Sequence, residues 1–151
     1  MFLDLGSNLG VYSLLVAQLR HSMGDGRPGR VVAVDAQANN LAFISHSLAK
    51  NNIPQQMITL VHNAISDVSE PLYPIPMEDD PKDNPGSWQF VSKVEVDEEG
   101  WEVLGEPTAS ITMASLLSGL PSSTFIVKVT NVNVAFLAPT GALVGMMRQY
   151  L

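Results

Sequence analysis

The sequence predicts an α/β fold with a doubly wound, mostly parallel sheet, and three observations support this prediction. Short apolar runs at residues 1–5, 31–34 and 58–62 have the length and composition of buried strands. Amphipathic stretches at residues 8–21 and 40–52 separate these runs and carry apolar residues at helical spacing. The resulting order of strand, helix, strand, helix and strand is the pattern from which parallel sheets are built.

Bulk composition restricts the class of protein. The 151 residues are enough for one domain with a core, and 46% hydrophobic with 15% charged residues is typical of a globular chain. No apolar run is long enough to cross a membrane and no signal sequence opens the chain. We therefore expect no membrane segment and, by the same absence, a cytoplasmic location, with that of any longer parent protein left open. The lack of cysteine excludes disulfides, thiolate nucleophiles and cysteine-bound zinc.

Acidic residues are concentrated in one part of the chain. The net charge is −7, yet residues 70–106 hold eleven of the fifteen acids and only two lysines, Lys82 and Lys93. Nucleic-acid binding needs a basic surface, so this distribution argues against a nucleic-acid partner. A solvated acidic loop is the simplest explanation of the segment.

The first strand leads into a glycine-containing loop. Asp4 is followed by Gly6 and Gly10, four residues apart, and then by the predicted helix 8–21. This is how a parallel sheet presents a backbone loop and a helix N-terminus to a nucleotide-like ligand; a tight turn without a ligand is the alternative. The helix face expected to pack on the sheet consists of Leu9, Tyr12, Leu15, Val16 and Leu19.

The second and third strands end in polar residues. The run 31–34 is followed by Asp35, and the helix 40–52 is expected to turn one face inward. The strand 58–62 leads into residues 63–67, which we expect to form a loop. The inward residues of the second helix are Leu41, Ile44, Ser45 and Leu48.

The pattern changes after residue 70. Five prolines predict an irregular loop over residues 71–86. Residues 88–96 and 101–104 alternate apolar and polar side chains around an acidic, glycine-ended turn, which predicts a β-hairpin. Its two tryptophans, Trp88 and Trp101, are most simply packing residues, with a substrate platform as the alternative.

The last part of the chain is less regular. Residues 111–120 predict a short helix and residues 125–129 another buried strand. The apolar tail 130–151 has no clear period and is left unassigned. The three histidines lack partners at metal-ligand spacing, so we expect no metal site.

Taken together, these segments resemble the FkbM family of methyltransferases that use S-adenosylmethionine (SAM). The quoted matches are Phe-Leu-Asp-Leu-Gly-Ser-Asn-Leu-Gly-Val-Tyr-Ser at 2–13, Val-Val-Ala-Val-Asp-Ala-Gln-Ala-Asn-Asn-Leu at 31–41, Asn-Ala-Ile-Ser-Asp at 63–67 and Ile-Thr-Met-Ala-Ser-Leu-Leu at 111–117. The resemblance implies a Rossmann-like class I fold, SAM as cofactor, and O-methylation of a small-molecule or sugar hydroxyl. A nicotinamide oxidoreductase is disfavoured because Asn8 replaces the second glycine of its fingerprint.

The resemblance also implies roles for individual residues. Asp4 would support the loop and face the positive end of SAM, while the loop amides would meet its methionyl carboxylate. Asp35 would accept both ribose hydroxyls, and residues 63–64 would lie beside the adenine, with Asp67 nearby. A helix cap at Asp4, a strand-end acid at Asp35 and a turn former at Asn63 are the alternatives. The implied cofactor-binding set is Asp4, Gly6, Ser7, Asn8, Gly10, Tyr12, Asp35, Asn63 and Ala64.

The sequence departs from the family after the fourth strand. Where the family has Lys-x-Asp-x-Glu-Gly, Lys128 is followed by Val-Thr-Asn-Val-Asn, so Thr130 holds the Asp position and Val132 the Glu position. This removes the obvious candidates for a general base, and no catalytic residue is assigned. A catalytically inactive SAM-binding or interaction fragment is therefore the alternative function.

The departure also sets the expected domain organisation. We expect a partial methyltransferase domain over residues 1–129, containing an acidic loop and hairpin insertion at 70–107, and a divergent tail at 130–151. The sheet would then be incomplete on its C-terminal side. An open strand edge of this kind favours self-association.

Overall fold

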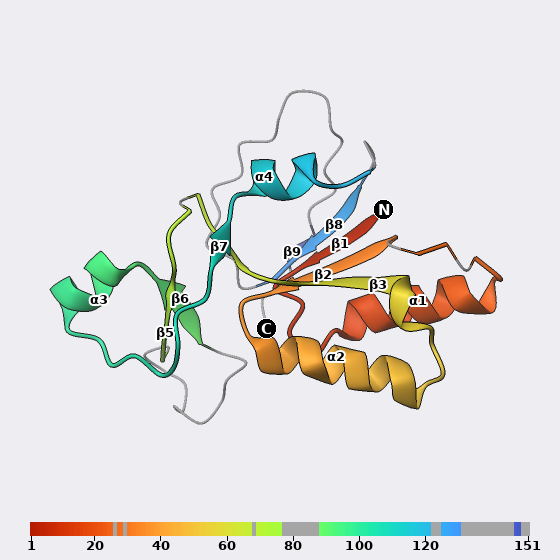
Figure 1. Cartoon of the computed structure of the whole chain (residues 1–151), viewed down its shortest axis with the longest axis horizontal. Helices are drawn as coiled ribbons and strands as arrows, with labels where there is room; N and C mark the ends of the chain where they lie inside the picture. The colour runs from red at the N-terminus through yellow and green to blue at the C-terminus, as the bar shows by residue number, and fades with distance from the viewer. Residues whose placement is uncertain are drawn as a thin grey trace.

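The structure is a computed structural model that describes residues 1–25, 27–28, 30–67, 69–76, 88–121, 125–130 and, for the backbone alone, 147–148. Its centre is a parallel sheet in the order β3-β2-β1-β8-β9 (Figure 1). The chain proceeds outward from β1 to β3 and then returns to the other side of β1. The strands are β1 (Phe2–Leu5), β2 (Val31–Asp35), β3 (Ile58–His62), β8 (Ile126–Val129) and β9 (Met147–Arg148).

Helices cover both faces of this sheet. Figure 1 shows α1 (Val11–Ser22) and α2 (Ala38–Lys50) below the strands and α4 (Met113–Ser118) above them. Two apolar clusters correspond to these layers: one joins α1 and α2 to β2 and β3, and the other joins α4 to β1, β2 and β8. The predicted α/β class with a mostly parallel sheet is confirmed, and the main strands lie within one residue of their predicted bounds.

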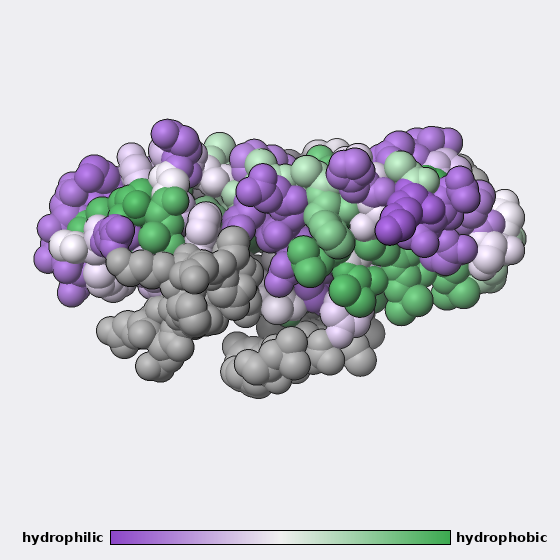
Figure 2. Space-filling model, turned by 90° about the horizontal axis from the view of Figure 1, so that it is seen from below, coloured by the Kyte–Doolittle hydropathy of each residue, from purple (hydrophilic) through white to green (hydrophobic). Residues whose placement is uncertain are grey.

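The packing face of α1 differs from the prediction. Ser13 and Ala17 are buried against the sheet, whereas Leu15 and Leu19 are 63% and 57% exposed, and Leu9 before the helix is exposed as well. Small side chains let the helix approach the strands closely, while Leu14 and Val16 pack partly buried beside them. Figure 2, which views the molecule from the side of α1 and α2, shows apolar residues gathered on this face. The second helix packs as predicted, with Leu41, Ile44 and Leu48 buried and Ser45 partly so.

The remaining strands are short. The segment 63–67 was expected to be a loop, but it contains β4 (Ala64–Ile65), which pairs in parallel with β7 (Ser110–Ile111). Within the acidic part of the chain, β5 (Tyr73–Ile75) pairs antiparallel with β6 (Gln89–Val91). The 3-10 turn η1 (Gln55–Met57) precedes β3.

The predicted hairpin around residues 97–100 is wrong, because this segment is the helix α3 (Lys93–Glu99). The Ser92 hydroxyl accepts a hydrogen bond from the backbone N–H of Glu95 at 3.2 Å, and the Glu95 carboxylate accepts one from the N–H of Ser92 at 2.8 Å. This reciprocal capping box satisfies two N–H groups at the helix start. Gly100, at φ 68°, ends the helix in the left-handed conformation that glycine adopts without strain.

Part of the acidic loop and most of the tail lie outside the described residues. For the loop these are residues 77–87, and for the tail residues 131–146 and 149–151. The tail contributes β9, which runs parallel to β8 at the edge of the described sheet. Among the helices in the described ranges, none is long and apolar enough to cross a membrane.

Candidate functional site

The loop after β1 is built from residues with left-handed backbone conformations. Gly6, Asn8 and Gly10 have φ values of 65°, 49° and 75°. Gly10 is also required by packing, because a Cβ at this position would lie 2.4 Å from Cγ1 of Ile44 in α2. The second glycine therefore both forms the turn and allows α1 and α2 to approach each other.

The amides of this loop donate to acceptors within the protein. The N–H groups of Gly6 and Ser7 both donate to the Val34 carbonyl at 3.0 Å, and that of Gly10 donates to the Ser7 carbonyl at 2.9 Å. The N–H of Asn8 donates to Oδ2 of Asp35 at 2.6 Å. Four of the five amides of residues 6–10 therefore already have an acceptor within the protein. The Ser7 hydroxyl, in a residue only 4% exposed, has no hydrogen-bond partner in the part of the chain that the structure describes.

Asp4 is fully buried and its charge is compensated. Its Oδ2 accepts hydrogen bonds from the N–H and hydroxyl of Ser13, at 3.2 and 2.8 Å. Its Oδ1 lies 2.8 Å from Nζ of Lys128, and the same ammonium lies 5.3 Å from the centre of the Tyr12 ring. Asp4 therefore joins β1, α1 and β8, where the resemblance implied a carboxylate facing a cationic ligand. The sequence analysis used Lys128 only to align the family pattern after the fourth strand and assigned it no role in the site.

Asp35 lies against the glycine loop. It is 7% exposed, and beyond its bond from Asn8 its Oδ1 accepts from the N–H of Gln37 at 2.9 Å and from Nδ2 of Asn40 at 3.1 Å. A carboxylate oxygen has two lone-pair positions, so the described residues fill Oδ1 and leave one position on Oδ2. The carboxylate can accept one further hydroxyl group, whereas the resemblance implied two.

Asn63 and Ala64 connect β3 to the segment before β7. The N–H of Asn63 donates to the Asp35 carbonyl, and its side-chain amide donates to the Ala109 carbonyl, both at 3.1 Å. Ala64 is buried, and its N–H donates to the same Ala109 carbonyl. Asp67 is exposed, with its Oδ1 3.4 Å from the Ser66 hydroxyl. Asn63, Ala64 and Asp67 do not line the cleft that lies at this edge of the sheet and is described next.

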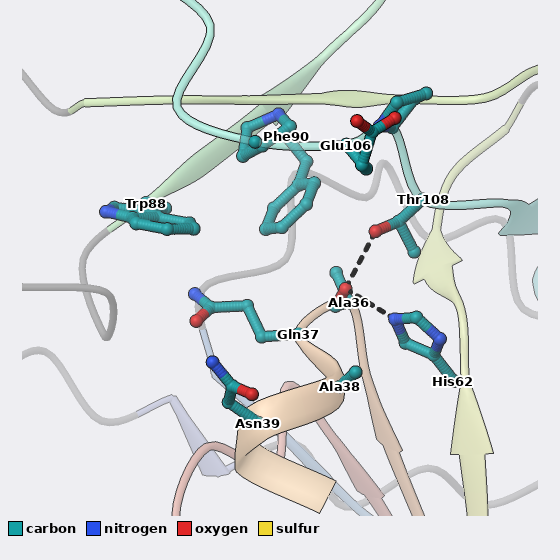
Figure 3. Close-up of a pocket in the computed structure, with 12 residues that line it drawn as sticks. Ala36, Gln37, Ala38, Asn39, His62, Trp88, Phe90, Glu106 and Thr108 are labelled. Atoms are coloured by element: carbon teal, nitrogen blue, oxygen red, sulfur yellow. Dashed lines mark hydrogen bonds between the residues drawn. The ribbon is translucent and has the colours of Figure 1, made fainter.

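This cleft has a volume of about 210 Å³, and its lining includes Ala36, the residue that follows Asp35 in the sequence. It lies between the start of α2, the end of β3 and the segment that carries β6 and residues 105–108. Figure 3 shows Trp88 and Phe90 on one side, opposite Gln37 and Asn39 of the α2 start. The sequence analysis gave Trp88 a substrate platform as the alternative role and did not name Phe90, Gln37 or Asn39 as site residues. These residues meet only when β5 and β6 are placed over the sheet edge.

Two side chains, one from this segment and one from β3, meet at the end of β2. Thr108 is buried and its hydroxyl donates to the Ala36 carbonyl at 2.9 Å. Nε2 of His62 lies 3.0 Å from the same carbonyl (Figure 3). The cleft is therefore bounded by hydrogen-bonded groups on its inner side and by aromatic side chains on its outer side.

Within the described ranges, no cluster of three histidine, aspartate or glutamate side chains could hold a metal ion. The ligand chemistry of the region is instead that of the buried Asp35 carboxylate, a glycine loop and an aromatic-walled cleft. No protein family, curated protein or solved structure matches this chain in comparisons with known proteins. The function must therefore be argued from the residues at the carboxyl ends of β1, β2 and β3.

Proposed function

We propose that this edge of the sheet binds SAM, and that the chain is a Rossmann-like, class I methyltransferase domain acting on a hydroxyl group of a small molecule or sugar. One observation carries the proposal: the Asp35 carboxylate joins the glycine loop, through the Asn8 amide, to a cleft that begins at the next residue. In open α/β sheets, ligands bind at the carboxyl ends of the strands beside the point where the strand order reverses. Here that point lies between β1 and β8.

The three parts of SAM have matching groups along this edge. The unpartnered Ser7 hydroxyl can donate to the methionyl carboxylate at the loop. The remaining lone pair of Asp35 Oδ2 can accept one ribose hydroxyl, and the cleft at the ends of β2 and β3 offers aromatic and amide groups to the adenine. SAM supplies an electrophilic methyl group, and the chain's residues bind and orient the reactants.

The second candidate function is SAM binding without catalysis. Thr130 stands at the end of β8, where the family pattern has an aspartate, and its N–H donates to the Leu5 carbonyl at 3.0 Å. A threonine hydroxyl is a poor general base for removing the proton of an acceptor hydroxyl. This observation favours a binding domain whose chemistry has been lost.

Calorimetric titration with SAM, S-adenosylhomocysteine and NAD tests the cofactor. We expect the two adenosyl amino acids to bind and NAD not to bind. Asp35→Asn keeps the shape of the side chain but removes its charge, and should weaken SAM binding about tenfold or more, the scale of a lost charged hydrogen bond. The exposed Asp67→Asn is the matched control and should leave affinity unchanged. Binding of NAD alone, or equal affinities of both variants, would contradict the proposal.

Methyl transfer itself separates the two candidates. SAM with a labelled methyl group is incubated with the chain and a panel of alcohols and sugars. Label in any acceptor above the protein-free background identifies a methyltransferase. SAM binding with no label transferred across the panel identifies the binding domain.

A further inference from the structure

A buried lysine lies beneath the start of the glycine loop. Lys128 stands beside Asp4 in the parallel pairing of β8 with β1, and its side chain is only 12% exposed. Its Nζ lies 2.8 Å from Oδ1 of Asp4 and donates to the Gly6 carbonyl at 3.0 Å. Lysine is seldom buried without a partner, and here an opposite charge and a carbonyl dipole both compensate the ammonium.

The peptide group between Gly6 and Ser7 is held from both sides. Its carbonyl accepts from Lys128 of β8, and its N–H donates to the Val34 carbonyl of β2. The two anchors come from strands on opposite sides of β1 in the sheet. With Gly6 at φ 65°, this peptide sets the direction in which the loop leaves β1.

Asp4 extends the network into α1. Its second oxygen accepts both the N–H and the hydroxyl of Ser13 in the first turn of the helix. One carboxylate and one ammonium therefore connect β1, β8, the loop start and the helix that follows the loop. Among the described residues near this loop, Asp35 alone remains as an acid without a cationic partner.

We propose that Lys128 is a positioning residue that fixes the Gly6–Ser7 peptide and hence the shape of the loop, with Asp4 as its counter-charge. The role in ligand binding rests on the proposed SAM site, whereas the role in loop geometry does not. Lys128 acts on the ligand only through the loop it holds. Lys128 lies 122 positions further along the chain than Gly6. The site at the ends of β1 and β2 is thus assembled only when β8 is in place.

Amide hydrogen exchange by NMR tests the positioning role without SAM. Lys128→Met alone leaves the Asp4 carboxylate buried and uncompensated, which can prevent folding. The double variant Asp4→Asn/Lys128→Met removes both charges, keeps acceptors for Ser13, and deprives the Gly6 carbonyl of its donor. We expect the Ser7 amide to exchange about tenfold faster or more in the double variant, the scale of a lost charged hydrogen bond. Amides of β2 and β3 should keep their wild-type rates.

Lys50→Met, at an exposed position ending α2, is the matched control and should leave all these rates unchanged. Wild-type exchange at Ser7 in a folded double variant would overturn the proposal. SAM titration of the same proteins separates the two hypotheses. If the Ser7 amide exchanges faster in the double variant but the wild type does not bind SAM, only the proposed function is contradicted. SAM binding with an unchanged Ser7 rate contradicts the positioning role alone.

Discussion

Residues 1–65 and the described part of the insertion, residues 70–76 and 88–107, are stabilised in different ways. The first region has helices of 12 and 13 residues on a parallel sheet, with a large apolar cluster between them. The insertion has two strands of three residues and a helix of seven, around a buried cluster of Ile75, Val91 and Val96. Periodic apolar burial therefore determines the first region, whereas a helix cap and short-strand pairing determine the insertion.

The largest expected effect tests the close packing of the first region. Gly10→Ala introduces a Cβ that would meet Ile44 at 2.4 Å, in a backbone conformation at φ 75° that alanine disfavours. We expect a loss of about 3 kcal/mol in the free energy of unfolding, measured by urea denaturation. Gly24→Ala is the matched control, since φ is 74° and, among the described residues beyond its chain neighbours, no atom lies within 4 Å of the added Cβ; it should cost about 1 kcal/mol. Equal losses would show that packing at Gly10 is loose.

The next effect compares the two apolar clusters. Leu48→Ala empties a fully buried position between α2 and the sheet, and should lower the free energy of unfolding by about 3 kcal/mol. Val96→Ala acts in the small cluster of the insertion, where we expect faster hydrogen exchange in α3 with little change in the urea midpoint. A shared fall in the midpoint for both variants would mean that the two regions unfold as one unit.

The smallest effect concerns the cap of α3. Ser92→Ala removes one half of the capping box and should cost about 1 kcal/mol, confined to this helix. Hydrogen exchange of the α3 amides, compared with those of α2, measures it. Ser22→Ala is the control, because its hydroxyl bonds a carbonyl at the exposed end of α1 and caps no helix start. If exchange in α3 is unchanged after Ser92→Ala, the helix is stabilised by the packing of Val96 against its apolar neighbours and not by the cap.

The sequence was sufficient to place the main strands and the two long helices of the first region, because continuous apolar runs mark these strands and helical spacing marks these helices. It failed for the face of α1, where burial follows the small residues Ser13 and Ala17 and leaves Leu15 and Leu19 exposed. It also failed for α3, where Val94 and Val96 alternate as in a strand. The three-residue spacing of Ser92 and Glu95 is the sequence pattern of a capping box, which predicts a helix start. Whether the two residues form that box depends on their geometry in the folded chain.

The candidate site divides in the same way. The approach of Asp35 to the glycine loop could be predicted, because neighbouring parallel strands bring their carboxyl ends together. The pairing of Asp4 with Lys128 depends on the register between β1 and β8, which no local pattern encodes. Trp88 and Phe90 reach the cleft only through the pairing of β6 with β5. Long-range pairing, rather than local propensity, decides these contacts.

The carbonyl of Ala36 has a consequence for what the cleft can recognise. Nε2 of His62 lies 3.0 Å from its oxygen, and the Thr108 hydroxyl donates to the same oxygen at 2.9 Å. A carbonyl oxygen has two lone-pair positions, so these two contacts occupy it. A ligand in the cleft must therefore find its hydrogen-bond acceptors on other groups, such as the side-chain amides of Gln37 and Asn39.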